Sequence, residues 1–135
     1  MSKHIESDIV HIGCKPEKVY NFISSFDNFT SLLPDKVENW QSDGDSCSFE
    51  VKGLAALGLR YTDKNPFTKV SMKGEGKLPF NFTLDANITE TAINQCDVQL
   101  VIDSDMSHFI SLMAANPLKN FIDTLASRLK LEMEK

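Results

Sequence analysis

Few side chains in this sequence have the type and position that acid–base chemistry requires. A general acid or base must be a titratable side chain inside a pocket. Tyr61 alternates in step with Leu57 and Leu59, so we expect its phenol to point inward. Glu50 and Asp103 alternate against their apolar neighbours, and we expect both carboxylates to face water. Because there is no inward titratable pair and no Gly-x-Ser-x-Gly motif, we assign no catalytic residue.

Metal and disulfide chemistry also find little support. The histidines are far apart and lack the His-x-x-x-His spacing of a zinc site: His4, His11 and His108. The cysteines are odd in number and lack Cys-x-x-Cys spacing: Cys14, Cys47 and Cys96. We therefore expect no metal, no cofactor and no disulfide. Reduced thiols, and an N-terminus without the apolar region of a secretory signal, predict a cytoplasmic protein.

Size and charge limit the class of protein. The chain has 135 residues, which suits a single domain covering residues 1–135 with a real core. Its net charge of −5 disfavours nucleic acid as a partner, because binding to phosphates needs a basic face. No apolar run approaches the ~20 residues of a membrane span. The expected molecule is a soluble globular domain.

The first third of the chain predicts a strand and two short helices. Residues 3–13 alternate as a strand, but Ile9, Val10 and Ile12 break the parity, which suggests a bulge. Pro16 suits the first position of a helix whose apolar residues recur at helical spacing through residue 26. Asp27 is a candidate cap for a second short helix, which Pro34 would end.

From residue 36 the hydrophobic period changes to two. The segments KVENWQ and CSFEVKG flank Ser-Asp-Gly-Asp, a strong hairpin signal. The length of that loop decides whether Val37 or Trp40 shares a face with Phe49, and the sequence leaves this open. Further on, residues 80–88 alternate cleanly, with apolar side chains on one face and polar ones on the other. One sheet face therefore packs against something apolar.

The last element, from about Asp105 to the C-terminus, carries a broad apolar stripe at helical spacing. We expect residues 118–129 to pack on the sheet as core and residues 106–115 to lie over a cavity. Pro117 interrupts the pattern, and Asn116 is a candidate to end one helical segment and cap the next. A static kink is favoured over a moving gate.

This order of elements resembles the START/Bet v 1-like (SRPBCC) helix-grip superfamily of polyketide cyclase/dehydrase and lipid-transport type. The resemblance covers nearly the whole chain and rests on four segments: CKPEKVYNFISSFDNFTSLLPD, WQSDGDSCSFEVKGLAALGLR, VSMKGEGKLPFNFTL and DSDMSHFISLMAANPLKNFIDTLASRL. Lys15 departs from the serine or alanine that often precedes the proline in similar proteins. The resemblance implies an α+β fold in which a curved antiparallel sheet of about seven strands wraps around a long C-terminal helix, with two short helices between the first two strands.

The resemblance also implies an internal cavity between the sheet and the C-terminal helix. The candidate lining residues are mostly large and apolar: Leu54, Leu57, Tyr61, Met72, Phe80, Phe82, Met106, Phe109, Ile110 and Met113. The GLAALGL stretch around Leu54 and Leu57 is interpreted as a lip at the cavity mouth, and the alternative is a bulge tucked into the core. For any single residue of the set, ordinary core packing is the simpler interpretation.

Three functions remain open at this stage. The favoured one is non-covalent binding or transport of a small hydrophobic molecule such as a lipid, quinone or polyketide. The second is a cyclase, aromatase or dehydratase that uses Tyr61 and the shape of the cavity. The third is a protein-interaction module of co-chaperone-like type. The polar outer face of residues 81–87 favours a monomer, with a weak dimer as the alternative.

Overall fold

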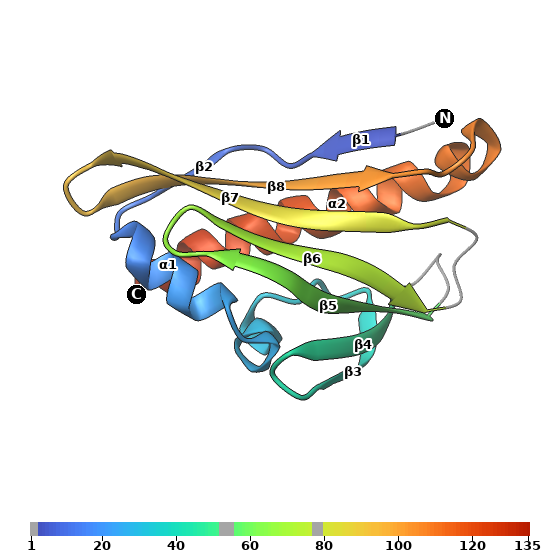
Figure 1. The fold of residues 1–135 in the computed structure, drawn as a ribbon, viewed down its shortest axis with the longest axis horizontal. Helices are drawn as coiled ribbons and strands as arrows, with labels where there is room; N and C mark the ends of the chain where they lie inside the picture. The colour runs from blue at the N-terminus through green and yellow to red at the C-terminus, as the bar shows by residue number, and fades with distance from the viewer. Residues whose placement is uncertain (1–2, 52–55, 77–79) are drawn as a thin grey trace.

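A sheet and one long helix dominate the computed structural model, which describes residues 3–51, 56–76 and 80–135. The strands are all antiparallel neighbours: β1 (Lys3–Glu6), β2 (Val10–Ile12), β3 (Val37–Ser42), β4 (Ser46–Val51), β5 (Ala56–Asn65), β6 (Lys69–Gly76), β7 (Phe82–Ala92) and β8 (Gln95–Ser104). Their order is β1-β8-β7-β6-β5-β4-β3, and β2 also pairs with β8. Helix α2 (His108–Met133) lies along one face of this sheet (Figure 1). The predicted α+β architecture is confirmed.

The sheet has eight strands in the described residues rather than about seven, because the predicted first strand is split. Between the pairs Glu6–Val101 and Val10–Val98, the N-terminal segment has three residues and β8 has two. The extra residue is accommodated at Ser7, whose backbone N–H donates to the Leu100 carbonyl at 2.8 Å. The hydroxyl of Ser7 accepts from the Leu100 N–H at 2.9 Å. The predicted bulge is therefore confirmed.

Two short helices connect β2 to β3. Helix α1 (Pro16–Ile23) begins at Pro16, and its N-cap Lys15 makes no side-chain capping bond. The 3-10 helix η1 (Phe26–Ser31) is capped by Ser25, whose hydroxyl accepts from the Asp27 N–H. The expectation that Asp27 caps this helix was wrong: its carboxylate instead accepts a hydrogen bond of 2.6 Å from the Ser42 hydroxyl. Asp27 thereby ties η1 to the end of β3.

A bulge in β3 settles the open choice between Val37 and Trp40. Val37 pairs with Val51, but the register shifts between Glu38 and Gln41. Asn39 occupies the left-handed region at φ 56°, which inserts an extra residue and restores the inward direction. Val37 and Trp40 therefore both face the core, where the Trp40 ring packs 5.4 Å from that of Phe49.

Helix α2 begins after Ser107, whose hydroxyl accepts from the Ile110 N–H at 3.2 Å. It continues as one helix through Pro117, so Asn116 does not end one segment and cap another. The apolar stripe on its C-terminal part is buried as predicted: Leu118, Phe121, Ile122, Leu125, Ala126, Leu129 and Met133. That buried stripe holds the helix on the sheet, which outweighs the single hydrogen bond that proline removes. No helix in the described residues has both the length and the apolar character needed to cross a bilayer.

A row of aromatic rings joins five elements. It runs from Tyr61 on β5 through η1 and β3 to β4 and α2, with successive ring centroids 4.2 to 6.2 Å apart: Tyr61, Phe26, Phe29, Trp40, Phe49 and Phe121. Such ring pairs contribute about 0.5–1.5 kcal/mol each beyond the area they bury. The row is the main packing between the β3–β5 part of the sheet and the two helices it meets.

Strand β5 also supplies the polar partners for the end of α1. The Tyr61 hydroxyl donates to the Ile23 carbonyl at 2.5 Å, and the Lys64 ammonium donates to the Ser24 carbonyl at 2.8 Å. Carbonyls at a helix C-terminus lack intrahelical partners, so these two side chains satisfy groups that would otherwise be unpaired. Burial raises the pKa of Tyr61 well above its ordinary value, which keeps the donor protonated.

Replacing Tyr61 with phenylalanine should lower the free energy of unfolding by about 1–2 kcal/mol, because the Ile23 carbonyl loses its donor while the ring stack remains. Urea denaturation followed by circular dichroism measures the change. The matched control is Tyr20→Phe: the described residues give the Tyr20 hydroxyl no partner, and its ring packs on Phe67 near the surface. Equal losses for the two variants would contradict the proposed role of the Tyr61 hydroxyl.

Candidate functional site

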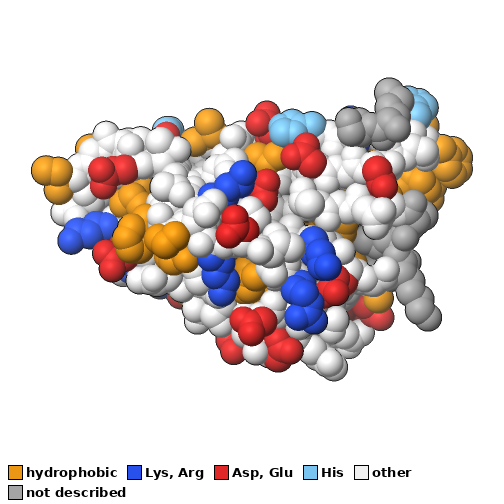
Figure 2. Space-filling model, in the orientation of Figure 1, with side chains coloured by type: hydrophobic (Ala, Val, Ile, Leu, Met, Phe, Trp, Pro, Cys, Tyr) orange, Lys and Arg blue, Asp and Glu red, His pale blue; other side chains and the backbone are white. Residues whose placement is uncertain are grey.

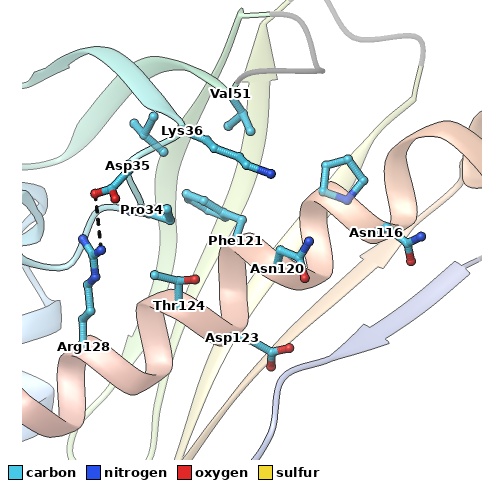
Figure 3. A pocket seen from close by; sticks show the side chains of 12 residues that line it. Pro34, Asp35, Lys36, Val51, Asn116, Asn120, Phe121, Asp123, Thr124 and Arg128 are labelled. Carbon is cyan, nitrogen blue, oxygen red and sulfur yellow. Dashed lines mark hydrogen bonds and ion pairs between the residues drawn. The ribbon is translucent and has the colours of Figure 1, made fainter.

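A cleft of about 520 Å³ opens where α2 diverges from the sheet. The helix packs closely on β1, β2 and β8, at one side of the sheet. On the other side, the segment 34–37 and Val51 at the end of β4 form one wall, and residues 116–128 of α2 form the other (Figure 3). The cleft therefore lies between the sheet and the C-terminal helix, but along residues 116–128 and not along residues 106–115, which were expected to lie over a cavity.

The floor of the cleft is apolar. The Phe121 ring is only 6% exposed and stacks on Phe49 with a centroid distance of 5.4 Å. Val37 and Val51 face each other across the β3–β4 pair and add aliphatic surface. Pro117 extends this surface along the helix. A ring or aliphatic chain lying here would meet carbon on two sides.

Several of the charges around the cleft are already compensated within the protein. The Arg128 guanidinium donates to the Leu33 carbonyl and lies 3.5 Å from the Asp35 carboxylate, as the dashed line in Figure 3 shows. The Asp123 carboxylate accepts from the Asp8 N–H at 2.8 Å and from the Lys119 ammonium at 2.8 Å. These groups attach α2 to segments on either side of it, and their primary role is structural.

Three polar side chains of the cleft are not engaged in this way. Lys36 is exposed, and in the described part of the chain it forms no ion pair or side-chain hydrogen bond. Its ammonium extends across the cleft above Phe121, toward the α2 wall (Figure 3). Asn116 and Asn120 are one helical turn apart on that wall and are likewise exposed without a side-chain bond among the described residues.

The interior behind this cleft is nearly full. An apolar void between the sheet and α2 measures about 20 Å³ and is bounded by Met72, Leu84, Ala86 and Leu100 on the sheet side. A space of that size holds about one water molecule, and an apolar lining keeps such a void dry. Of these two spaces between the sheet and α2, only the open cleft has the volume for a ligand, and the void is ordinary packing.

The structure places the predicted lining residues in several different environments. Five are buried in the described structure: Leu57, Met72, Phe80, Phe82 and Met106. The Phe82 ring covers Gly74, where an added β-carbon would lie 2.1 Å from it. The Tyr61 hydroxyl donates a hydrogen bond to the Ile23 carbonyl. Ile110 is half-buried, and Leu54 lies outside the described residues. None of the nine described residues lines the 520 Å³ cleft. Their role in ligand binding stays a prediction.

The two remaining residues of that set are exposed on the first turns of α2. Phe109 is 68% exposed and Met113 is 62% exposed. Steps of three or four residues carry the same helix face from Phe109 through Met113 to Asn116 and Asn120. Phe109 and Met113 therefore lie on the same outward helix face as the two asparagines, nearer the start of the helix, where Figure 2 shows hydrophobic side chains gathered at one end of the molecule.

Sequence reasoning did not identify Lys36, Asn120 or Phe121 as cleft residues. Phe121 belongs to an apolar stripe that looks like plain core, and it is indeed mostly buried. Asn116 and Asn120 lie on the helix face opposite the buried stripe, where polar residues are expected in any case, so they gave no separate signal for a cleft.

The side chains that could act as acids, bases or metal ligands are either bonded to other protein groups or buried as neutral thiols. Glu50 accepts from the Asn39 amide at 2.8 Å, and Asp103 pairs with His4 at 2.6 Å, which with Glu6 raises the pKa of His4. Burial raises the pKa of the Cys47 thiol to about 12 and that of Cys96 to about 11, so both remain protonated. No group of three or more metal-ligating side chains occurs among the described residues.

Comparisons with known proteins now bear on the fold. No protein-family model and no curated protein sequence matches the chain. Among solved structures, norcoclaurine synthase from Thalictrum flavum has 12% identity and a TM-score of 0.79, over 100% of this chain and 88% of that one. A START superfamily protein from Mycobacterium smegmatis has 12% identity and a TM-score of 0.70, over 97% of each chain.

A third similar structure is the Aha1 dimer from Colwellia psychrerythraea, with 20% identity, a TM-score of 0.68 and coverage of 98% of this chain and 96% of that one. Identities this low show the fold alone. Together with the strand order and the single long helix, they establish that the chain has the START/Bet v 1-like helix-grip fold.

Proposed function

We propose that the protein binds a small, largely apolar molecule non-covalently in the cleft between α2 and the β3–β4 side of the sheet. The observation that carries this proposal is the cleft itself, with about 520 Å³ of space and an apolar floor formed by Phe121, Val37 and Val51. Ligand sites are typically about 300–1,000 Å³, mostly apolar, with a few polar groups that orient the ligand.

Burial of the ligand's apolar surface would supply the binding free energy, at about 25 cal/mol per Å² before the costs of association. Lipids, quinones and polyketides all offer such surface, and we propose this general class. Covalent chemistry is not part of the proposal, because the Tyr61 phenol and the carboxylates of Glu50 and Asp103 already have protein partners. The fold supports the proposal only by analogy with other helix-grip proteins.

We further propose that Phe109 and Met113 form an apolar lip of this site. Both are exposed on the first turns of α2, on the same helix face as Asn116 and Asn120 of the cleft. An exposed large apolar side chain is common singly, but two on consecutive turns beside a cleft indicate a contact surface. Ligand would then pass over the start of α2 before it reaches Phe121.

Filling the cleft should block binding. N-phenyl-1-naphthylamine, a neutral apolar dye that fluoresces on burial, is the probe. Asn120→Trp places an indole in the cleft from an exposed position, and we expect it to weaken dye binding by roughly tenfold, equivalent to about 1.4 kcal/mol.

The control is Ser127→Trp, two turns further on α2 and exposed outside the cleft. It should leave the dissociation constant of the dye unchanged. Unfolding midpoints for both variants establish that the fold is intact. Absence of dye binding to the unmodified protein, or equal weakening by the two tryptophans, would contradict the proposed site.

A charge on the lip should reduce uptake without unfolding the protein. Met113→Asp puts a carboxylate in the path of the apolar dye, so we expect several-fold weaker binding and a change in unfolding free energy within about 0.5 kcal/mol, as for other surface sites. Leu131→Asp is the matched control, since Leu131 is 65% exposed near the far end of the same helix. Unchanged dye binding by Met113→Asp would remove the lip from the site.

A further inference from the structure

The charged side chains that line the cleft differ in whether they already have a partner of opposite charge. Arg128 is paired with Asp35 and bonded to the Leu33 carbonyl, and Asp123 is paired with Lys119 and bonded to the Asp8 N–H. Lys36 is the cleft-lining cation for which the described residues provide no carboxylate. With Arg128 paired to Asp35 and Asp123 paired to Lys119 outside the cleft, Lys36 is the lining charge left without a counter-ion among the described residues.

The position of that group relates it directly to the apolar floor. The Lys36 side chain leaves the segment after η1 and spans the cleft above the Phe121 ring (Figure 3). Lysine stems commonly pack on apolar surface while the ammonium stays in contact with water. A molecule resting on Phe121 would thus have its apolar part below the lysine stem and one end beside the ammonium.

On the opposite wall Asn120 points toward the Lys36 ammonium and offers donors to the same end of such a molecule, whereas the Asn116 amide points away from Lys36 (Figure 3). Asn116 and Asn120 are separated by one turn of α2, and each carries an amide with two N–H donors. A carboxylate, phosphate or sulfonate has two or three oxygens that can accept from an ammonium and from an amide together. A neutral apolar molecule would leave these groups in contact with water and gain nothing from them.

We propose that the ligand is an amphipathic anion: an apolar body on Phe121, with one anionic group held by Lys36 opposite Asn120. This inference rests on the proposed function and adds the chemical class of the ligand to it. Lys36 is exposed, so its contribution is that of a solvent-accessible charge pair, modest in size and reduced by salt.

Two dyes that differ by a single sulfonate test the inference. 8-Anilinonaphthalene-1-sulfonate is N-phenyl-1-naphthylamine with a sulfonate added, so the ratio of their affinities isolates the anionic group. Lys36→Met keeps the length and apolar character of the stem while removing the charge. We expect it to weaken binding of the sulfonated dye by roughly 2- to 5-fold and to leave the neutral dye unchanged. Added salt should weaken the sulfonated dye in the unmodified protein and have little effect in the variant.

The control is Lys73→Met on β6, an exposed lysine that does not line the cleft, which should change neither dye. Competition against the neutral dye by decanoate, decyl phosphate and decanol then distinguishes carboxylate from phosphate, with decanol as the uncharged reference. If the neutral dye binds but Lys36→Met affects both dyes equally or neither, the anionic group is refuted and the apolar site stands. If neither dye binds the unmodified protein, both proposals fall.

Discussion

The aromatic row from Tyr61 to Phe121 is the packing on which the rest of the structure depends. Helix α2 lies against β1, β2 and β8, so the curled sheet carries β3 and β4 away from it. Packed aromatic rings fill the space between α2 and these strands. The last ring, Phe121, is where this packing stops and the cleft begins.

This arrangement separates two kinds of surface on the same helix. On the core side of the ring row, the apolar stripe of α2 is buried against the sheet. The remaining void there would hold about one water molecule. Toward the cleft, the helix presents the amides of Asn116 and Asn120, and nearer its start Phe109 and Met113 are exposed outside the cleft. The Arg128–Asp35 ion pair and the hydrogen bond from the Asp8 N–H to Asp123 fix the helix at that boundary, so it is held from both sides. The apolar floor and the polar rim therefore have a fixed spacing.

Periodicity predicted most of the fold, since the alternation in residues 80–88 and the stripe on α2 each depend on one element alone. Periodicity could not predict that Val37 and Trp40 both face the core. Asn39, in the left-handed region, adds a residue to β3 and so reverses the alternation of inward and outward side chains. The cleft was also beyond periodicity: its walls come from residues 34–37, Val51 and residues 116–128, and their meeting depends on how the sheet curls. Phe121 looked like core because it is core on one side.

The bonds from β5 to the end of α1 have a consequence for the order of folding. Helix α1 has eight residues, and isolated helices of that length are unstable in water. Its terminal carbonyls receive their donors from residues 38 and 40 positions further along the chain. During synthesis α1 would leave the ribosome well before Tyr61 and Lys64, so it has no local means of persisting. We therefore expect α1 to become stably helical only after β5 has been made and has supplied these donors.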